Sequence, residues 1–195
     1  MTTDRKFAAF SKAKPPTEAS RNAGNVPSFR MKEIPDGGFC LSAFLIISET
    51  GNEGRVLMGR LNPEAPWDHI GALDKSRVQA HSNGWMLPSS HLIIHESPQE
   101  TAQRILKEQL GIDEAIILSG PKVVSEVYTP KRFPDIQNHW DLEFIFNGTL
   151  TSRQVHGGNI WTDLRFLRVN EMSRSEITRS HEDVLESAGF KFLDG

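Results

Sequence analysis

The sequence predicts an α/β fold in which one mixed β-sheet lies between helices. Several short segments alternate apolar and polar side chains at the period of a β-strand, and they stand on both sides of one strongly capped, amphipathic helix near residues 97–111. A second helical pattern closes the chain near residues 173–189. Strands, a helix, more strands and a closing helix are typical of a sheet covered by helices.

Composition excludes several classes of protein. The 195 residues suit one domain with a tail, and the formal net charge of −3 gives no basic field for a nucleic acid. The single cysteine, Cys40, excludes an internal disulfide and is typical of a reducing compartment. No apolar run approaches the roughly 20 residues that cross a bilayer, and the N-terminus has no signal-peptide core. We therefore expect a cytoplasmic protein without membrane contacts.

Residues 1–34 are predicted to form a flexible N-terminal tail. Their sequence, which includes "SKAKPPTEASRNAGNVPS", is rich in Pro, Ser, Ala and Lys and shows no hydrophobic period. The folded domain is expected to comprise residues 35–195. Because the tail lacks apolar surface to offset the entropy of ordering, we expect the domain to fold without it.

The domain is expected to begin with a β-hairpin. The two strands are "FCLSAFLIIS" and "RVLMGR", and the turn formers of "ETGNEG" separate them. Residues 61–84 then form a long connection, and connections of this length in compact domains are often functional. Trp67 in this connection is a candidate to cover a pocket.

The helix that follows is the most clearly specified element. "HLIIHE" is predicted to be a strand that leads into it. Ser97 is a good N-cap, Pro98 suits the first helical position, and Glu100 completes an S-x-x-E capping box. Apolar side chains recur at helical spacing until Gly111, a residue type that commonly ends helices.

Alternation predicts the remaining strands. "AIILSG" and "KVVSEVYT" are strand-like, and "WTDLRFLRV" is another candidate. "HWDLEFIFNGTL" is a clear strand, in which His139, Asp141 and Glu143 share one face and the apolar residues share the other. "SRSEITRSHEDVLESAG" is expected to close the chain as a helix.

The segment "WMLPSSHLIIHESPQETAQRILKEQLGI" resembles the signature of the Nudix hydrolases, G-x5-E-x7-R-E-U-x-E-E-x-G-U, in which U is a bulky apolar residue. The matching positions are Glu96, Arg104, Leu106, Glu108, Gly111 and Ile112. The resemblance covers roughly residues 39–190 and implies the Nudix-type α/β/α sandwich. It also implies cleavage of a nucleoside diphosphate linked to another group, with a divalent metal, usually magnesium, held by the helix.

The chain departs from this signature at the positions that concern the metal. Ser89 and Ser90 replace the usual glycines, Ile105 replaces the acid after the arginine, and Gln109 replaces the second acid of the closing pair. At about 100° per residue these helix positions share one arc, and three carboxylates there repel one another unless cations neutralise them. With one acid left, Glu108, the metal is expected to bind weakly.

The remaining metal donors are then Glu108, the Gln109 amide and a backbone carbonyl near Ser89. Mg²⁺, or Mn²⁺ in its place, is expected to arrive mainly with the phosphates of the substrate, because magnesium often binds through one or two carboxylates plus substrate oxygens.

The resemblance assigns catalytic roles to Glu96, Arg104 and Glu108, with the arginine orienting one of the acids. An ordinary salt-bridge ladder is the alternative, because Glu100, Arg104 and Glu108 are four residues apart. Ile105 is interpreted as an extension of the apolar stripe of the helix.

Other polar and aromatic residues are candidates outside the helix. Glu143 is a supplementary catalytic acid and Asp141 a substrate contact, although alternating polar residues also suit a solvent-facing side of a strand. His95 is a candidate phosphate contact or proton carrier. Trp67 is a candidate to stack on a base, although tryptophan is more often a core residue.

A zinc site formed by the two histidines of "HLIIHE" is disfavoured. If this segment is extended, the rings of His91 and His95 lie roughly 13 Å apart. Zn–N bonds are about 2.0–2.1 Å long, so one ion does not reach both rings.

The sequence therefore predicts a Nudix-type hydrolase, a pyrophosphohydrolase or a nucleotide-sugar hydrolase, with a depleted metal site. The alternative is a non-catalytic Nudix-fold module that binds a nucleotide or a protein, and the two missing helix acids favour it. A third candidate is another reaction in the same pocket, such as isomerisation. The expected partner is a nucleotide-like small molecule, and a homodimer is compatible with the sequence.

Overall fold

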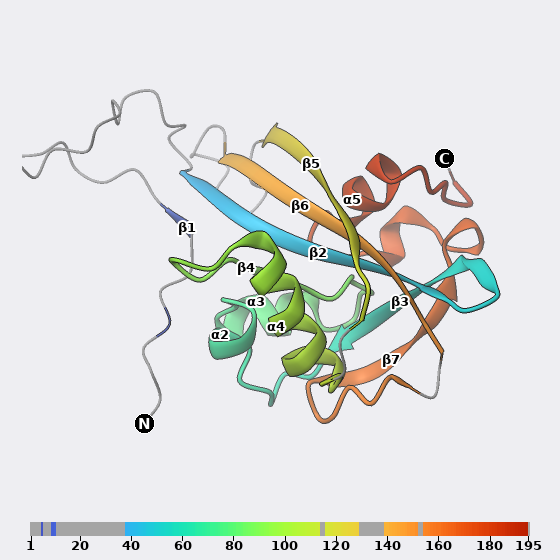
Figure 1. The fold of residues 1–195 in the computed structure, drawn as a ribbon, viewed down its shortest axis with the longest axis horizontal. Coiled ribbons are helices and arrows are strands. Elements are labelled where there is room, and N and C mark those ends of the chain that lie inside the picture. Colours follow the sequence, from blue (N-terminus) through green and yellow to red (C-terminus); the bar gives the residue numbers. More distant parts are fainter. Residues whose placement is uncertain are drawn as a thin grey trace, which may run out of the picture.

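The computed structural model describes Arg5 and residues 9–10, 38–113, 116–128, 139–151 and 154–194, and it has one mixed sheet with helices on both faces (Figure 1). The strands are β1 (Ala9–Phe10), β2 (Phe39–Glu49), β3 (Asn52–Leu61), β4 (Ser89–His91), β5 (Ser119–Tyr128), β6 (His139–Leu150) and β7 (Trp161–Arg168). The α-helices are α2 (Trp67–Ile70), α3 (Lys75–His81), α4 (Pro98–Leu110) and α5 (His181–Ser187). No helix among the described residues has both the length and the apolar composition to span a bilayer.

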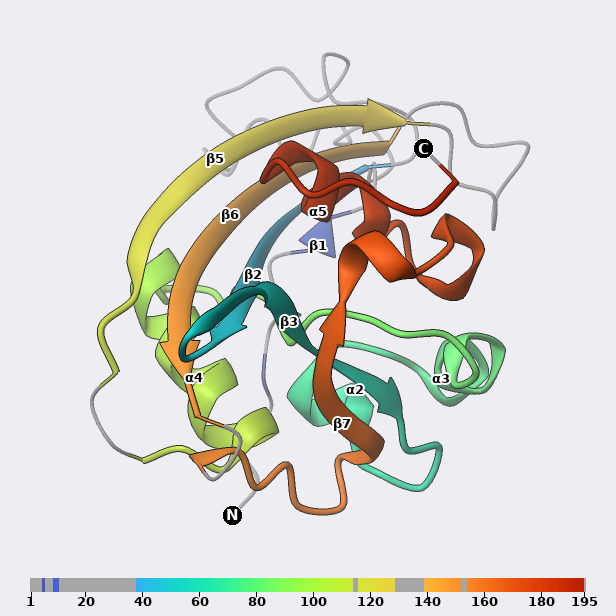
Figure 2. The same cartoon turned by 90° about the vertical axis from the view of Figure 1, so that its right-hand side faces the viewer.

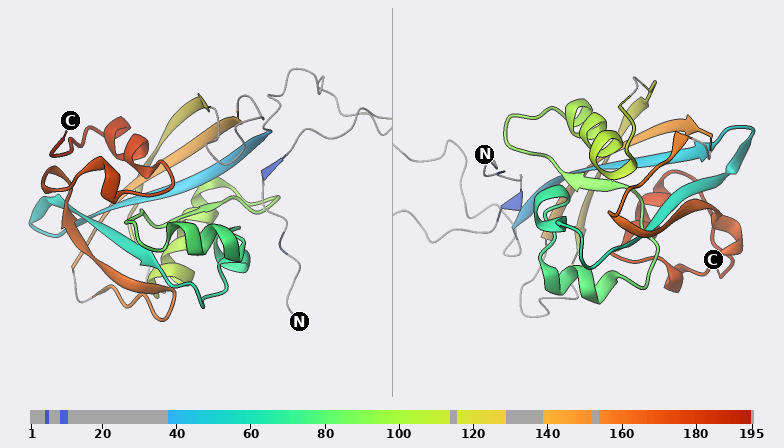
Figure 3. Two further views of the ribbon diagram at one scale, coloured as in Figure 1. Left: turned by 180° about the vertical axis from the view of Figure 1, so that it is seen from behind. Right: turned by 90° about the horizontal axis from the view of Figure 1, so that it is seen from below.

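The strand β2 lies at the centre of the sheet, whose order is β5-β6-β2-β3-β7. It pairs in parallel with β6 along its whole length and antiparallel with β3, which confirms the predicted hairpin. The short strands β1 and β4 also pair with β2, and β1 lies beside its first residues (Figure 3). The predicted mixed sheet between helices is thereby confirmed.

Alternation along β2 and β6 separates two cores, one on each face of the sheet. Leu45 and Phe146 pack on the face that α4 covers, whereas Ile46 and Ile145 pack on the face that α5 covers. Figure 2 shows β5 and β6 curving side by side along this sheet. Neighbouring residues of one strand therefore face two different environments.

The connection of residues 61–84 is more ordered than the sequence predicts. It contains α2 and α3, whose apolar side chains form a third core cluster with Trp161. Trp67 is 1% exposed, its ring meets that of Trp161 edge-on at 4.9 Å between centroids, and its Nε1 donates to the Asn62 carbonyl at 3.1 Å. Trp67 is thus a core residue.

The helix α4 has the predicted ends. Ser97 accepts from the Glu100 amide, Glu100 in turn accepts from the Ser97 amide, and Gly111 ends the helix in the left-handed conformation at φ 68°. Ile105 is completely buried in the core beneath the helix. The interpretation of Ile105 as part of the apolar stripe is confirmed.

Three predicted elements differ from the structure. "HLIIHE" is a strand only at its first residue, because a turn follows at Ile94 and His95. In "AIILSG" only the last two residues belong to β5; Glu114 and Ala115 lie beside or within this segment but outside the described residues.

The closing helix is the third difference, since α5 comprises only His181–Ser187. Thr178 donates its amide to the Trp85 carbonyl at 2.9 Å, and Arg179 and Ser180 adopt positive φ angles of 62° and 58°. A helix does not continue through positive φ angles, so it begins only after them.

Replacement of Ile105 by glutamate is expected to lower the free energy of unfolding by about 3 kcal/mol or more, because it places a carboxylate in the core. The matched control is Gln103→Glu on the exposed side of the same helix, which should change that free energy by less than about 0.5 kcal/mol. Urea unfolding measures both, and equal effects would contradict a core position for Ile105.

Candidate functional site

Arg104 and Glu96 form a two-pronged ion pair at the start of α4. Arg104 Nε donates to Glu96 Oε1 at 2.8 Å and Nη2 donates to Oε2 at 3.0 Å. Glu96 also accepts from the Ile93 amide at 3.1 Å and the Thr101 hydroxyl at 2.8 Å. Burial acts to raise the pKa of Glu96, but the bonds from Arg104, Ile93 and Thr101 outweigh it and hold the pKa below its usual value. Glu96 is therefore a fixed anion.

The same guanidinium ties α4 to neighbouring segments. Arg104 Nη2 donates to the His91 carbonyl at 3.0 Å, and Nη1 reaches the Ser90 hydroxyl at 3.3 Å and the Ile70 carbonyl at 3.4 Å. Ser90, which stands at a glycine position of the signature, also donates to the Ile70 carbonyl at 3.1 Å. Arg104 thus holds Glu96 in place and joins α4, β4 and α2.

Glu108 is paired with a residue that the sequence analysis assigned to the flexible tail. Arg5 Nη2 donates to Glu108 Oε1 at 2.6 Å, and Nη1 donates to Oε2 at 2.8 Å and to the His69 carbonyl at 2.9 Å. The two side chains are only 19% and 25% exposed. Arg104 Nη1 lies farther away, at 3.9 Å from Glu108 Oε2. The composition of residues 1–34 contains no signal for this contact.

Gln109 is completely buried and binds the backbone of Ser89 at both of its polar groups. Its Oε1 accepts from the Ser89 amide at 3.2 Å and its Nε2 donates to the Ser89 carbonyl at 2.8 Å. The amide side chain therefore joins α4 to β4 by a pair of hydrogen bonds that resembles one step of a β-ladder.

Glu143 lies on the other face of the sheet, the face that α5 covers. Its neighbour Ile145 belongs to the core on that face, and Glu143 is itself only 7% exposed. Burial, together with the nearby carboxylates of Asp141, Glu126 and Asp183, raises the pKa of Glu143 to about 8. Glu143 therefore carries a proton at neutral pH, and it is not a solvent-facing residue.

Two hydrogen bonds of His91 lie between this acid and the helix site. The His91 ring Nδ1 pairs with the Ser42 hydroxyl at 2.9 Å, and Ser42 stands opposite Glu143 in the register of β2 and β6. The His91 carbonyl accepts from Arg104. Asp141, the predicted substrate contact, accepts a hydrogen bond from the buried thiol of Cys40.

Solved structures with similar folds identify the architecture. The NUDIX domain of Shewanella oneidensis NrtR, complexed with ADP ribose, matches with a TM-score of 0.55 and 15% identity over 89% of this chain and 97% of that chain. A MutT NUDIX hydrolase from Burkholderia pseudomallei matches with a TM-score of 0.51 and 15% identity over 76% and 96%. The chain has the Nudix fold.

The E. coli dihydroneopterin triphosphate pyrophosphohydrolase is a further similar structure, with a TM-score of 0.50 and 16% identity over 75% of this chain and 92% of that chain. No protein-family model and no curated protein matches the sequence. At these identities the similarity establishes the Nudix fold, and the chemistry of the site has to be argued from the residues of this chain.

The side chains do not fit the divalent-metal site that a Nudix fold implies. Ile105 is in the core, Gln109 and Ser89 bind each other, and both oxygens of Glu108 accept from Arg5. Within the described parts of the chain, no group of three or more His, Cys, Asp or Glu side chains is placed to hold a metal ion. The metal role of Glu108, Gln109 and Ser89 stays a prediction, and in this arrangement each of them already has another partner.

The two other predicted substrate contacts, His95 and Trp67, differ in their exposure to solvent. His95 is exposed in the turn before α4, with a φ angle of 79°, and its phosphate role stays a prediction. The extended geometry assumed for residues 91–96 is wrong, because this turn bends the chain after Ile93. Trp67, buried against Trp161, has no exposed ring face for a base.

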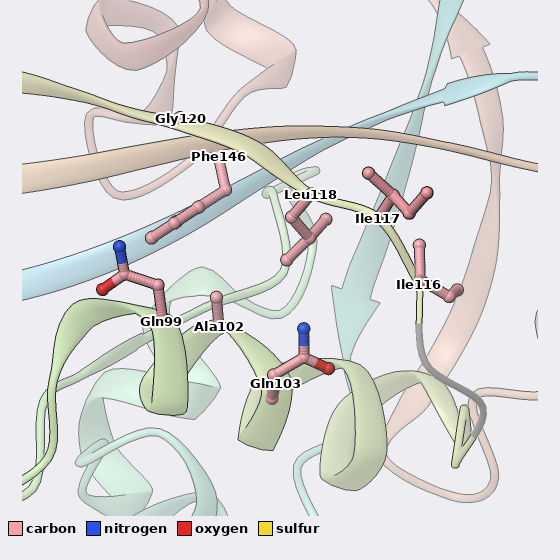
Figure 4. A pocket seen from close by; sticks show the side chains of 8 residues that line it. All are labelled: Gln99, Ala102, Gln103, Ile116, Ile117, Leu118, Gly120 and Phe146. Carbon is pink, nitrogen blue, oxygen red and sulfur yellow. The ribbon is translucent and has the colours of Figure 1, made fainter.

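A pocket of about 250 Å³ lies between α4 and the segment that leads into β5 (Figure 4). Two glutamine amides and several apolar side chains line it: Gln99, Ala102, Gln103, Ile116, Ile117, Leu118, Gly120 and Phe146. It is smaller than the roughly 300 Å³ at which ligand pockets begin, and it contains none of the predicted site residues. It is not the candidate centre.

Gln109→Glu, which restores one acid of the signature, is expected to destabilise the fold by about 2–4 kcal/mol. An ionised carboxylate still accepts from the Ser89 amide, but it places an oxygen against the Ser89 carbonyl where Nε2 now donates. Burial raises the pKa of the introduced carboxyl in the folded state, so the loss should shrink as the pH falls from 7 and be smallest below about pH 4, where the carboxyl is protonated and donates again. Urea unfolding at pH 7 and at acid pH measures this, and a loss independent of pH would contradict the argument.

Glu143 is expected to make the fold less stable as the pH rises. Its folded pKa of about 8 exceeds the value of 4.5 for a free side chain, so its contribution is complete below about pH 4.5 and is lost towards pH 8. Glu143→Gln should remove this decline, which unfolding free energies between pH 5 and pH 9 will show. Replacement of the exposed Glu64 by Gln is the control. If the unfolding free energy of Glu143→Gln changed with pH as that of the wild type does, the raised pKa of Glu143 would be refuted.

Proposed function

We propose that this protein is a Nudix-fold module that binds a nucleoside-diphosphate-type compound and does not cleave it with a metal held by α4. The proposal rests on the side chains at positions 105, 108 and 109 of α4, where the Nudix signature has three acids. Of these three positions, one is a core isoleucine, one is an amide bound to the backbone of Ser89, and one is a glutamate bound by Arg5.

Electrostatics supports binding without a metal. A cluster of unpaired carboxylates repels a diphosphate unless cations stand between them. Here Glu96 is paired with Arg104 and Glu108 with Arg5, so each acid is compensated by a guanidinium of the same chain. A diphosphate that approaches this side of α4 does not need a divalent ion to screen these acids.

The ligand class rests on similarity of fold. The NUDIX domain of Shewanella oneidensis NrtR, which was solved with ADP ribose, is covered over 97% of its length by this chain. ADP-ribose has the two features that the proposal requires, a pyrophosphate and a nucleoside. We therefore choose it as the first probe, and the base and the linked group of the natural ligand are left open.

Metal-assisted hydrolysis is the second candidate. Glu96, Arg104 and Glu108 stand at the family spacing, and Arg104 contacts both acids. Glu143 holds a proton at neutral pH, as a general acid does. This candidate requires that Glu108 release Arg5 and that the fold supply further oxygen donors beside it.

ADP-ribose is expected to bind in EDTA with a dissociation constant below about 1 mM, and Mg²⁺ should not tighten binding by more than about twofold. Glu108→Gln should not lower the affinity, because it removes a negative charge beside the ligand phosphates. Calorimetry measures both, and chromatography of the mixture with Mg²⁺ should show intact ADP-ribose. Mg²⁺-dependent products that are lost in Glu108→Gln, from ADP-ribose or a panel of nucleotide sugars, would establish the hydrolase instead.

A further inference from the structure

Arg5 is held in place by contacts on two sides. Its guanidinium donates to both oxygens of Glu108, at 2.6 and 2.8 Å, and to the carbonyl of His69 at 2.9 Å. It thereby bridges α4 and the last turn of α2. A fork of two parallel N–H···O bonds to a carboxylate is among the stronger hydrogen-bond arrangements in proteins.

A second anchor lies a few residues along the chain. β1 pairs antiparallel with β2, with Ala9 opposite Cys40 and Phe10 opposite Phe39. Four residues span at most about 14 Å, so this pairing limits how far Arg5 can lie from Ala9. Arg5 and Glu108 therefore meet within one chain, and Arg5 stays within reach of Glu108.

The charges around Glu108 are balanced by this contact. Arg104 is already committed to Glu96 by two short bonds, and its nearest nitrogen lies 3.9 Å from Glu108. Arg5 is therefore the main cation that balances the charge of Glu108. The hydrogen bond to Glu108 and the charges of Glu108 and Glu96 also raise the pKa of Arg5 above its usual value.

We propose that Arg5 is the resident cation of this site. Its guanidinium occupies the oxygens of Glu108 that the Nudix signature assigns to a divalent metal, so the N-terminal segment is part of the site and excludes a metal from it. This extends the proposed function, because it makes the absence of a free acid at the site depend on Arg5 as well as on α4.

The competition favours the arginine for a physical reason. A metal ion must displace a guanidinium that fits a carboxylate at both oxygens and that the chain tethers at an effective concentration of the order of millimolar or higher. Magnesium also gives up its water ligands reluctantly. With Arg5 removed, Glu108 keeps only its longer contact of 3.9 Å with Arg104, and a divalent ion gains access to its carboxylate oxygens.

The test uses Mn²⁺ alone and the full chain. Paramagnetic Mn²⁺ broadens backbone amide signals near its binding site even when it binds weakly, so it is titrated into the wild type, Arg5→Ala and the control Arg168→Ala, which removes an exposed arginine bound to Glu171. A fourth protein, Arg5→Ala with Glu108→Gln, removes the acid as well.

In Arg5→Ala, the amides of residues 104–108 should broaden at an Mn²⁺ concentration at least about tenfold lower than in the wild type. Arg168→Ala should behave as the wild type does, and the double variant should lose the effect. Equal broadening in the wild type and Arg5→Ala, or an effect that survives Glu108→Gln, would overturn the proposal.

Hydrogen exchange supplies a second readout that needs no metal. Loss of the Arg5 fork should speed exchange of the amide protons of Ala9 and Phe10, with Arg5→Lys between Arg5→Ala and the wild type, because lysine keeps the charge but not the fork. Unchanged exchange in Arg5→Ala would contradict the anchoring role. Neither measurement uses a nucleotide, so a failure here is distinct from a failure of ADP-ribose to bind.

Discussion

The two-pronged bond between Arg104 and Glu96 is the contact on which the site depends. It fixes the turn that enters α4, because Glu96 also receives the Ile93 amide. Other N–H groups of the guanidinium donate to the Ile70 carbonyl of α2 and the His91 carbonyl of β4. β4 also carries Ser89 and Ser90, which replace the signature glycines. A lysine has a single charged centre and does not satisfy this set of acceptors. The arginine of the signature thus has a structural role that is independent of any catalytic one.

The two α4 residues that depart from the signature fit the packing of this helix against its neighbours. Ile105 and Gln109 are both fully buried, and a buried side chain has to match its neighbours in polarity. Isoleucine meets this requirement in an apolar cluster. Glutamine meets it beside Ser89, because its side chain has both N–H donors and an acceptor oxygen, and the Ser89 backbone presents one acceptor and one donor. A glutamate offers only acceptors, so the substitution is compatible with burial and the family residue is not.

Local patterns made part of this structure predictable. The capping box and the C-terminal glycine of α4 lie within a few residues of one another, and the alternation of β6 reports its two faces directly. The remainder depends on distant segments. Arg5 and Glu108 are 103 positions apart, Glu143 is buried only because neighbouring elements cover it, and α5 begins late because residues near Thr178 bind Trp85. The composition of residues 1–34 predicts a flexible tail that includes Arg5. Composition does not report a single specific contact such as the one between Arg5 and Glu108.

The two faces of the sheet compensate their acids in different ways. Beside α4, each of the two acids is matched by a guanidinium, which stays charged at every ordinary pH. On the α5 face, Glu143 lies among other carboxylates and is compensated by a proton, which is lost near pH 8. The first arrangement is insensitive to pH and the second is sensitive to it. His91 contacts both sides, through its carbonyl to Arg104 and its ring to Ser42. A change in the charge of Glu143 is therefore expected to reach the helix site through β2 and β4, the strands that carry these contacts.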